Sequence, residues 1–233
     1  MFRRTFPKVK FRLNKALDKE ICFAFLKHKK GGLDFGRGII KVHPSLTSVK
    51  KFPVDKQKQA IEQYTDQFYR VHQNQLRKAK QNFQKEWDKK AADFFKEVDK
   101  IFDRHPWPKG PYFGYISIFP CGPRFLEEKS FQVFYLRHPR VRPVSHEILH
   151  FLFYDYIEKS FPEEDSSSEA IWILSEITNS LVLDSPQFRK IIGVLHLHAY
   201  PAQKRLLSRL KPLWQRDNLR SFLKKSLPLV KTR

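Results

Sequence analysis

The feature that most constrains this fold is an apolar segment, Val144–Tyr154, that carries a few polar side chains. Its sequence is VSHEILHFLFY, and apolar residues continue to Ile157. The segment predicts a helix that is apolar nearly all round and is therefore buried in a core. The polar residues inside it need partners there, because an unpaired polar group buried away from water costs a few kcal/mol.

Three of these polar residues, His146, Glu147 and His150, form the pattern H-E-x-x-H. On a helix, residues four apart lie on one face, about one turn from each other. The two imidazoles can therefore reach one Zn²⁺ from the same side, and Glu147 would face the open position of the metal. The alternative is purely structural: the histidines bond core carbonyl groups and the glutamate reaches solvent.

Composition indicates a large globular chain. The 233 residues include 22 Phe and can bury a sizeable core. No run of about 18 or more apolar residues occurs, so the sequence predicts no transmembrane segment. Two cysteines, Cys22 and Cys121, make neither a disulfide framework nor a metal-ligand cluster. We therefore expect a cytoplasmic chain.

The net charge of +21 is unevenly distributed along the chain. Residues 143–200 hold 3 Lys and Arg against 9 Asp and Glu, whereas residues 1–142 and 201–233 carry net charges of +18 and +9. Basic surfaces attract nucleic acid or anionic membranes. Nucleic acid therefore stays open as a partner. The alternative is a solvated basic surface, since no Lys/Arg-aromatic recognition motif stands in the sequence.

The first part of the chain predicts short strands and turns. Residues 21–26 and 38–43 are apolar runs, and the glycines between them suit a hairpin-like connection. A helix over residues 15–27 is the competing interpretation. From 53 to 102, apolar residues at spacings of three and four predict a long helix, or two helices with a kink near residues 72–75.

The second part alternates strands and helices. Residues 112–119 and 131–136 are rich in aromatic and β-branched residues and predict strands. Pro143 then suits the first turn of the helix that carries the motif. Ser166 and Glu169 form a capping-box pattern for the next helix.

The remaining segments predict further helices. Pro186 opens an apolar helix over residues 188–197, and residues 202–233 form a basic amphipathic helical tail. The sequence thus predicts an α+β fold, predominantly helical, with a small mixed or antiparallel sheet. Its expected parts are an N-terminal strand and hairpin segment (1–52), a core (53–200) and the basic C-terminal tail (201–233).

The order of elements over about residues 53–200 resembles the gluzincin metallopeptidases, the thermolysin-like branch of the zincins. In that group the third zinc ligand is a Glu on the helix after the motif helix, and Glu176, 26 residues after His150, matches that position. The resemblance implies a zinc site of His146, His150 and Glu176. The chain departs from the group four residues after the ligand Glu, where Ser180 replaces an Asp. Support of the site would then pass to Asn179, to Ser180 or to another residue.

Two other carboxylates are rivals for the third ligand position. Asp155 lies five residues after His150 on the same helix, which would point it away from the metal. Glu169 precedes Glu176 and suits a helix cap. The longer H-E-x-x-H-x-x-G-x-x-H pattern of the metzincins is absent, since positions 153 and 156 are Phe and Tyr.

Taken with the residue types, the resemblance implies a zinc-dependent peptidase that acts on a peptide or protein substrate. Glu147 would take a proton from the zinc-bound water as it attacks a carbonyl, and pass it to the leaving amine. Tyr200 or His198 would stabilise the oxyanion, unless Tyr200 and Pro201 only turn the chain. The strand over residues 131–136 would be the sheet edge that pairs with an extended substrate.

Two further function classes stay open. One is a basic, nucleic-acid-associated binding protein on a zincin-like scaffold. The other is a scaffold that binds zinc structurally and cleaves nothing.

Overall fold

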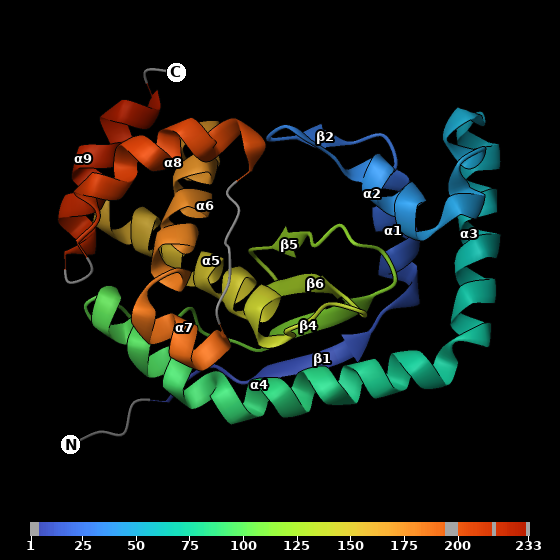
Figure 1. Cartoon of the computed structure of the whole chain (residues 1–233), viewed down its shortest axis with the longest axis horizontal. Coiled ribbons are helices and arrows are strands. Elements are labelled where there is room, and N and C mark those ends of the chain that lie inside the picture. Colours follow the sequence, from blue (N-terminus) through green and yellow to red (C-terminus); the bar gives the residue numbers. More distant parts are fainter. Residues whose placement is uncertain (1–4, 194–199, 216–217, 232–233) are drawn as a thin grey trace. The chain divides into compact units, whose positions relative to one another are not determined.

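The computed structural model describes residues 5–193, 200–215 and 218–231. Their fold is α+β and mainly helical, with a four-stranded mixed sheet and a two-stranded sheet, which confirms the predicted class (Figure 1). None of the helices in these residues combines the length and the apolar character needed to cross a membrane.

The chain divides into two compact units. The strand unit comprises residues 8–87 and 111–140, and the helical unit comprises residues 1–7, 88–110 and 141–233. The helix α4 (Gln73–Ile101) contributes to both units, and the basic C-terminal tail belongs to the helical unit. The three predicted segments, 1–52, 53–200 and 201–233, stay a prediction.

The sheet of the strand unit has the order β1-β4-β6-β5. Its strands are β1 (Val9–Leu13), β4 (Tyr112–Ser117), β5 (Arg124–Phe125) and β6 (Ser130–Phe134). Strand β4 pairs in parallel with β1 on one side and with β6 on the other, and β5 pairs antiparallel to β6. The predicted strands near 112–119 and 131–136 are therefore present. The expectation that the second is a sheet edge is wrong, because β6 lies between β4 and β5 in the sheet.

Two predicted strands are helices instead. The apolar run 21–26 belongs to α1 (Lys15–Phe25), and the run 38–43 belongs to α2 (Phe35–Val42). Each helix begins after a capping side chain: Asn14 accepts from the backbone N–H of Leu17, and Asp34 accepts from that of Arg37. A short apolar run fits a strand and a buried helix equally well, and these caps decide for the helix.

The glycines between these helices form a hairpin, but it does not join the two runs that were expected to be strands. Strands β2 (Lys29–Lys30) and β3 (Leu33–Asp34) pair antiparallel across Gly31 and Gly32, whose φ angles are 59° and 82°. Two successive residues with positive φ suit the tight turns that match strand twist, which is why glycine stands at both positions.

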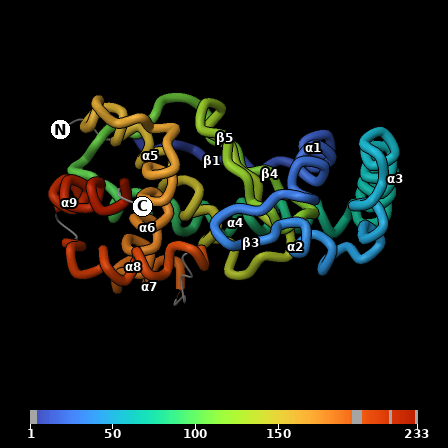
Figure 2. Tube along the Cα trace, turned by 90° about the horizontal axis from the view of Figure 1, so that it is seen from above, coloured from blue at the N-terminus to red at the C-terminus, as the bar shows by residue number. Residues whose placement is uncertain are grey.

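The predicted long helix with a kink is confirmed. It consists of α3 (Val54–Val71) and α4, which are separated at His72. Helix α1 lies beside α3 (Figures 1 and 2). In the strand unit, α4 packs on β1: the rings of Phe83 and Phe11 lie 5.6 Å apart, and the Gln84 amide bonds backbone groups of β1. The apolar stripe read from the sequence is therefore the packing face of this helix.

The helical unit is built around the motif helix α5 (Val141–Ser160) and the next helix, α6 (Glu169–Leu183). Helix α6 contacts α5, α7 (Pro186–Ile192) and α9 (Leu219–Lys231). The residue that caps α6 is Ser168, which accepts from the backbone N–H of Ile171, and not the predicted Ser166. The helical unit also contains α8 (Lys204–Leu210) and 3-10 turns at 201–203 and 211–213. The strand unit has 3-10 turns at 44–46 and 49–51.

A buried carboxylate anchors α1 to the sheet of the strand unit. Asp18 is 0% exposed and accepts hydrogen bonds from Ser117 Oγ at 2.5 Å, Tyr69 OH at 2.7 Å and Gln132 Nε2 at 3.0 Å. The backbone N–H of Ile118 donates a fourth, at 3.2 Å. Burial nevertheless raises the pKa of Asp18 to about 6, against the opposing effect of these donors.

This shift predicts a loss of stability as the pH rises. Asp18 is protonated in the folded and unfolded chain below about pH 4; between pH 4 and 6 only the unfolded chain ionises, which favours unfolding by up to about 3 kcal/mol. Asp18→Asn removes this titration. We expect the stability of the wild type relative to Asp18→Asn, measured by denaturant unfolding, to fall by about 3 kcal/mol from pH 4 to pH 7. A difference that stays constant over this range would contradict the shift.

Candidate metal centre

Helix α5 brings two histidines to one face of a buried helix. His146 and His150 are four residues apart, and their imidazole Nε2 atoms lie 3.1 Å from each other. His150 is 0% exposed, while the side chain of His146 is 25% exposed. The prediction that this helix is buried is confirmed, since its apolar residues from Ile148 to Ile157 all lie in the core.

Helix α6 supplies the carboxylate that completes the cluster. Glu176 Oε2 lies 3.2 Å from His146 Nε2, and Glu176 Oε1 lies 3.5 Å from His150 Nε2. One ligand atom of each residue can be chosen so that all three lie within 4.8 Å of one another. Among the described residues this is the single group of three or more His, Cys, Asp or Glu side chains that could hold a metal ion in this way.

The electrostatics of the cluster suit a cation. Burial by itself would raise the pKa of Glu176. The positive field of His150 and the hydrogen bonds with both histidines outweigh burial, so the pKa of Glu176 lies well below its ordinary value. A carboxylate that stays ionised at neutral pH beside two imidazole nitrogens is a ligand set for a divalent metal.

Comparison with protein-family models, curated proteins and solved structures finds no match. What the site does must therefore be argued from its own residues. The gluzincin resemblance rests on the H-E-x-x-H pattern and on the spacing of Glu176, and it stays a prediction.

The two rival carboxylates lie elsewhere. Asp155 accepts from Lys159 and forms an ion pair with His105 at 2.6 Å, so it faces away from the cluster as its position on the helix predicts. Glu169 is the first residue of α6 and is exposed. Of the three carboxylates weighed from the sequence, only Glu176 meets the histidines. Neither the motif nor helix periodicity could identify it without the packing of α6 on α5.

The remaining predicted site residues have different outcomes. Glu147 lies on α5 and is 7% exposed, so it does not reach into solvent as the structural alternative supposes. Tyr200 packs its ring against Trp172 of α6, with the centroids 5.1 Å apart. His198 lies outside the described residues. A role for either of the last two in binding an oxyanion stays a prediction.

Asn179 ties the two helices of the cluster together. Its side-chain Nδ2 donates to the backbone carbonyl of His146 at 2.9 Å, and the residue is 0% exposed. Ser180, at the position where the gluzincin metallopeptidases have an Asp, bonds to the backbone carbonyl of Glu176. Of the two candidates named from the sequence, Asn179 is the one that reaches the motif helix.

Asn179→Ala is expected to loosen the site without removing a ligand. Loss of the amide leaves a buried carbonyl without one of its donors and opens space between α5 and α6, so we expect a loss of about 1–3 kcal/mol in unfolding free energy. Metal affinity should fall by about 10–100-fold, as is usual when a supporting residue is removed. Denaturant unfolding and a competitive chelator titration measure the two effects. Unchanged metal affinity would show that the contact does not position His146.

Proposed function

We propose that this protein is a zinc-dependent peptidase in which His146, His150 and Glu176 hold the metal and Glu147 is the general base. The observation that carries the proposal is the geometry of the three donor groups. It is supported by the placement of all three in one unit, on two helices that pack against each other.

The distances between the donors fit zinc. Zinc binds imidazole nitrogen and carboxylate oxygen at about 2.0–2.2 Å with tetrahedral geometry, so its ligand atoms lie about 3.3–3.6 Å from each other. The separations here are 3.1 Å between the two Nε2 atoms, 3.2 Å from Glu176 to His146 and 3.5 Å from Glu176 to His150. The side chains therefore need to move only by tenths of an ångström to bind the ion.

Among the residues that the structure describes, the cluster offers three ligands with a glutamate beside them, which supports catalysis over a structural role. Zinc sites that only stabilise a fold are closed by four protein ligands, whereas catalytic sites have three and leave one position open. Zinc held here would act as a Lewis acid and lower the pKa of a water molecule towards 7. Glu147 would accept the proton of the attacking water and deliver it to the leaving amine of the peptide.

Access to the site is from the side of His146. The side chain of His146 is 25% exposed, while those of His150 and Glu176 are 0% and 4% exposed. A peptide carbonyl would approach along the exposed imidazole, and the buried pair would form the base of the site. Strand β6 is not a free sheet edge for the substrate, because β5 already pairs with its residues Ser130 and Phe131.

The test combines metal analysis with peptide hydrolysis. Protein purified without chelators should contain one zinc per chain and should cleave peptides in a library of mixed sequence. If the protein contains zinc but cleaves none of the peptides, the alternative of a scaffold that binds zinc and cleaves nothing is favoured. Iron in place of zinc would contradict the proposal, since two histidines and one carboxylate also form the facial triad of iron oxygenases.

A further inference from the structure

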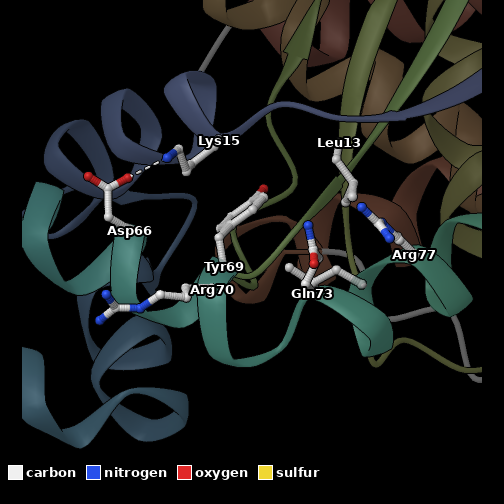
Figure 3. A pocket seen from close by; sticks show the side chains of 8 residues that line it. Leu13, Lys15, Asp66, Tyr69, Arg70, Gln73 and Arg77 are labelled. Atoms are coloured by element: carbon white, nitrogen blue, oxygen red, sulfur yellow. Dashed lines mark ion pairs between the residues drawn. The ribbon is translucent and has the colours of Figure 1, made fainter.

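A surface pocket of the strand unit is lined by four elements, three of which contribute a basic side chain. Its volume is about 520 Å³, and its walls come from the end of β1, the start of α1 and the two helices on either side of the break at His72. Three of its residues are cations, Lys15, Arg70 and Arg77, and one is an anion, Asp66 (Figure 3). The pocket therefore carries an excess of positive charge.

The two arginines are not neutralised by the protein. Asp66 forms ion pairs with Lys15 at 2.7 Å and with Lys19 at 3.1 Å. In the part of the chain that the structure describes, neither Arg70 nor Arg77 pairs with a carboxylate, and both are exposed. Arginine presents a planar fork of donors that matches phosphate oxygens, so two unpaired arginines on one pocket suit a phosphate-bearing ligand.

The arrangement of the pocket suits an extended anion. In Figure 3, Arg70 and Arg77 stand well apart, with Tyr69 and Gln73 between them. The wall between the arginines is firm, because the hydroxyl of Tyr69 donates to the buried Asp18 at 2.7 Å. Arginines on two different helices, with other side chains between them, can each hold a separate phosphate of an extended chain.

A second feature of the strand unit favours nucleic acid over other polyanions. Phe113 and Tyr115 of β4 are half-buried and stacked, with ring centroids 6.4 Å apart and planes within 25°. The parallel register sets the exposed Lys10 and Arg12 of β1 beside them, and the Arg12 guanidinium lies 4.0 Å from the centre of the Phe113 ring. Stacked aromatic rings beside cations are the usual platform for unpaired bases, and neither an acidic peptide nor a lipid head group needs them.

We propose that the strand unit binds single-stranded nucleic acid. Arg70 and Arg77 hold backbone phosphates at the pocket, and Phe113 and Tyr115 offer a surface on which bases stack. The two features lie on opposite faces of the sheet at its edge strand β1, because side chains alternate along a strand: Arg12 flanks the aromatic pair, and its neighbour Leu13 lines the pocket. A bound nucleic-acid strand would therefore pass around this edge of the sheet. The inference does not depend on the metal centre, which lies in the other unit.

The experiment measures binding of a fluorescent single-stranded oligonucleotide of about 15 nucleotides to the full chain over a range of salt concentrations. The variant Arg70→Ala/Arg77→Ala loses two phosphate contacts. Each contact adds about 0.7 to the slope of log affinity against log salt, so the slope should fall by about 1.4 and affinity at physiological salt by about tenfold. The matched control is Arg37→Ala/Arg137→Ala, which removes two exposed arginines of the same unit that do not line the pocket.

A third variant, Tyr115→Ala, separates stacking from charge. It should weaken binding by roughly five- to a hundred-fold and leave the salt slope unchanged. Thermal unfolding of each variant shows that the fold is retained. Equal losses in the pocket variant and the arginine control would overturn the proposal. So would competition by poly-glutamate or anionic vesicles that exceeds competition by unlabelled single strand, because the partner would then be an acidic protein or a membrane.

Discussion

Glu147→Gln protein is expected to bind zinc as the wild type does and to hydrolyse peptides more slowly by a factor of about 10² to 10⁴. The substitution keeps the size of the side chain and its capacity for hydrogen bonds, and it removes only the ability to accept a proton. Because Glu147 is 7% exposed, a neutral amide is also easier to bury than a carboxylate, so stability should not fall through desolvation. The measurement is kcat/KM on a cleaved peptide at matched zinc loading.

The control for this variant is Glu158→Gln, the same change on an exposed position of the same helix. It should leave both zinc content and hydrolysis unchanged. Equal activity of Glu147→Gln and the wild type would mean that the base is another residue or that the cleavage comes from a contaminant. A variant that loses zinc together with activity would indicate that Glu147 holds the metal site together and is not its base.

Removal of Glu176, the metal ligand that we propose on α6, is expected to have the second large effect. Glu176→Gln replaces a carboxylate by a neutral amide at 3.2 and 3.5 Å from the two imidazoles. The amide binds zinc poorly, and the loss of a direct ligand should exceed the 10–100-fold effect of a supporting residue. We expect zinc affinity to fall by more than about a hundredfold, measured by competition with a chromophoric chelator.

The free energy of unfolding should increase when zinc is bound. At free zinc a thousandfold above Kd, binding stabilises the folded state by about 4 kcal/mol, and a chelator should remove this stabilisation from the wild type. It should leave Glu176→Gln almost unaffected, because that protein binds little zinc. His138→Ala, an exposed histidine of the strand unit, is the control and should respond to the chelator as the wild type does. Identical unfolding curves for the wild type with and without chelator would argue against a metal centre.

The spacing of apolar residues along the sequence determined the helices in which that spacing is regular. The three-and-four spacing of apolar residues predicts the long helix and its break at His72, since both follow from the geometry of one helix. The same geometry places His146 and His150 on one face of α5 before any tertiary contact is known. The α+β class follows from these helices and from the aromatic strand segments.

Where the local pattern is ambiguous, tertiary structure decided. The runs 21–26 and 38–43 are too short for periodicity to separate a strand from a buried helix. The caps at Asn14 and Asp34 favour the helix, and the hydrogen bonds of buried Asp18 hold α1 against the sheet. The position of β6 inside the sheet depends on the return of β5, a strand of two residues with no pattern of its own. The division into units likewise depends on contacts between distant segments.

The two candidate sites likewise depend partly on the sequence alone and partly on tertiary contacts. The sequence determined that this chain can present two histidines and a glutamate on one buried helix. Helix position already set Asp155 aside, and the resemblance pointed to Glu176. That Glu176 meets the two histidines depends on the packing of α6 on α5, which decides which faces of the two helices are in contact. Arg70 and Arg77, seven residues apart across the break, have no local signal, and the aromatic pair of β4 joins Arg12 only through the register of a parallel sheet. Spacing along one helix is a property of the sequence, whereas a site shared by elements far apart in the chain exists only once the long-range contacts have formed.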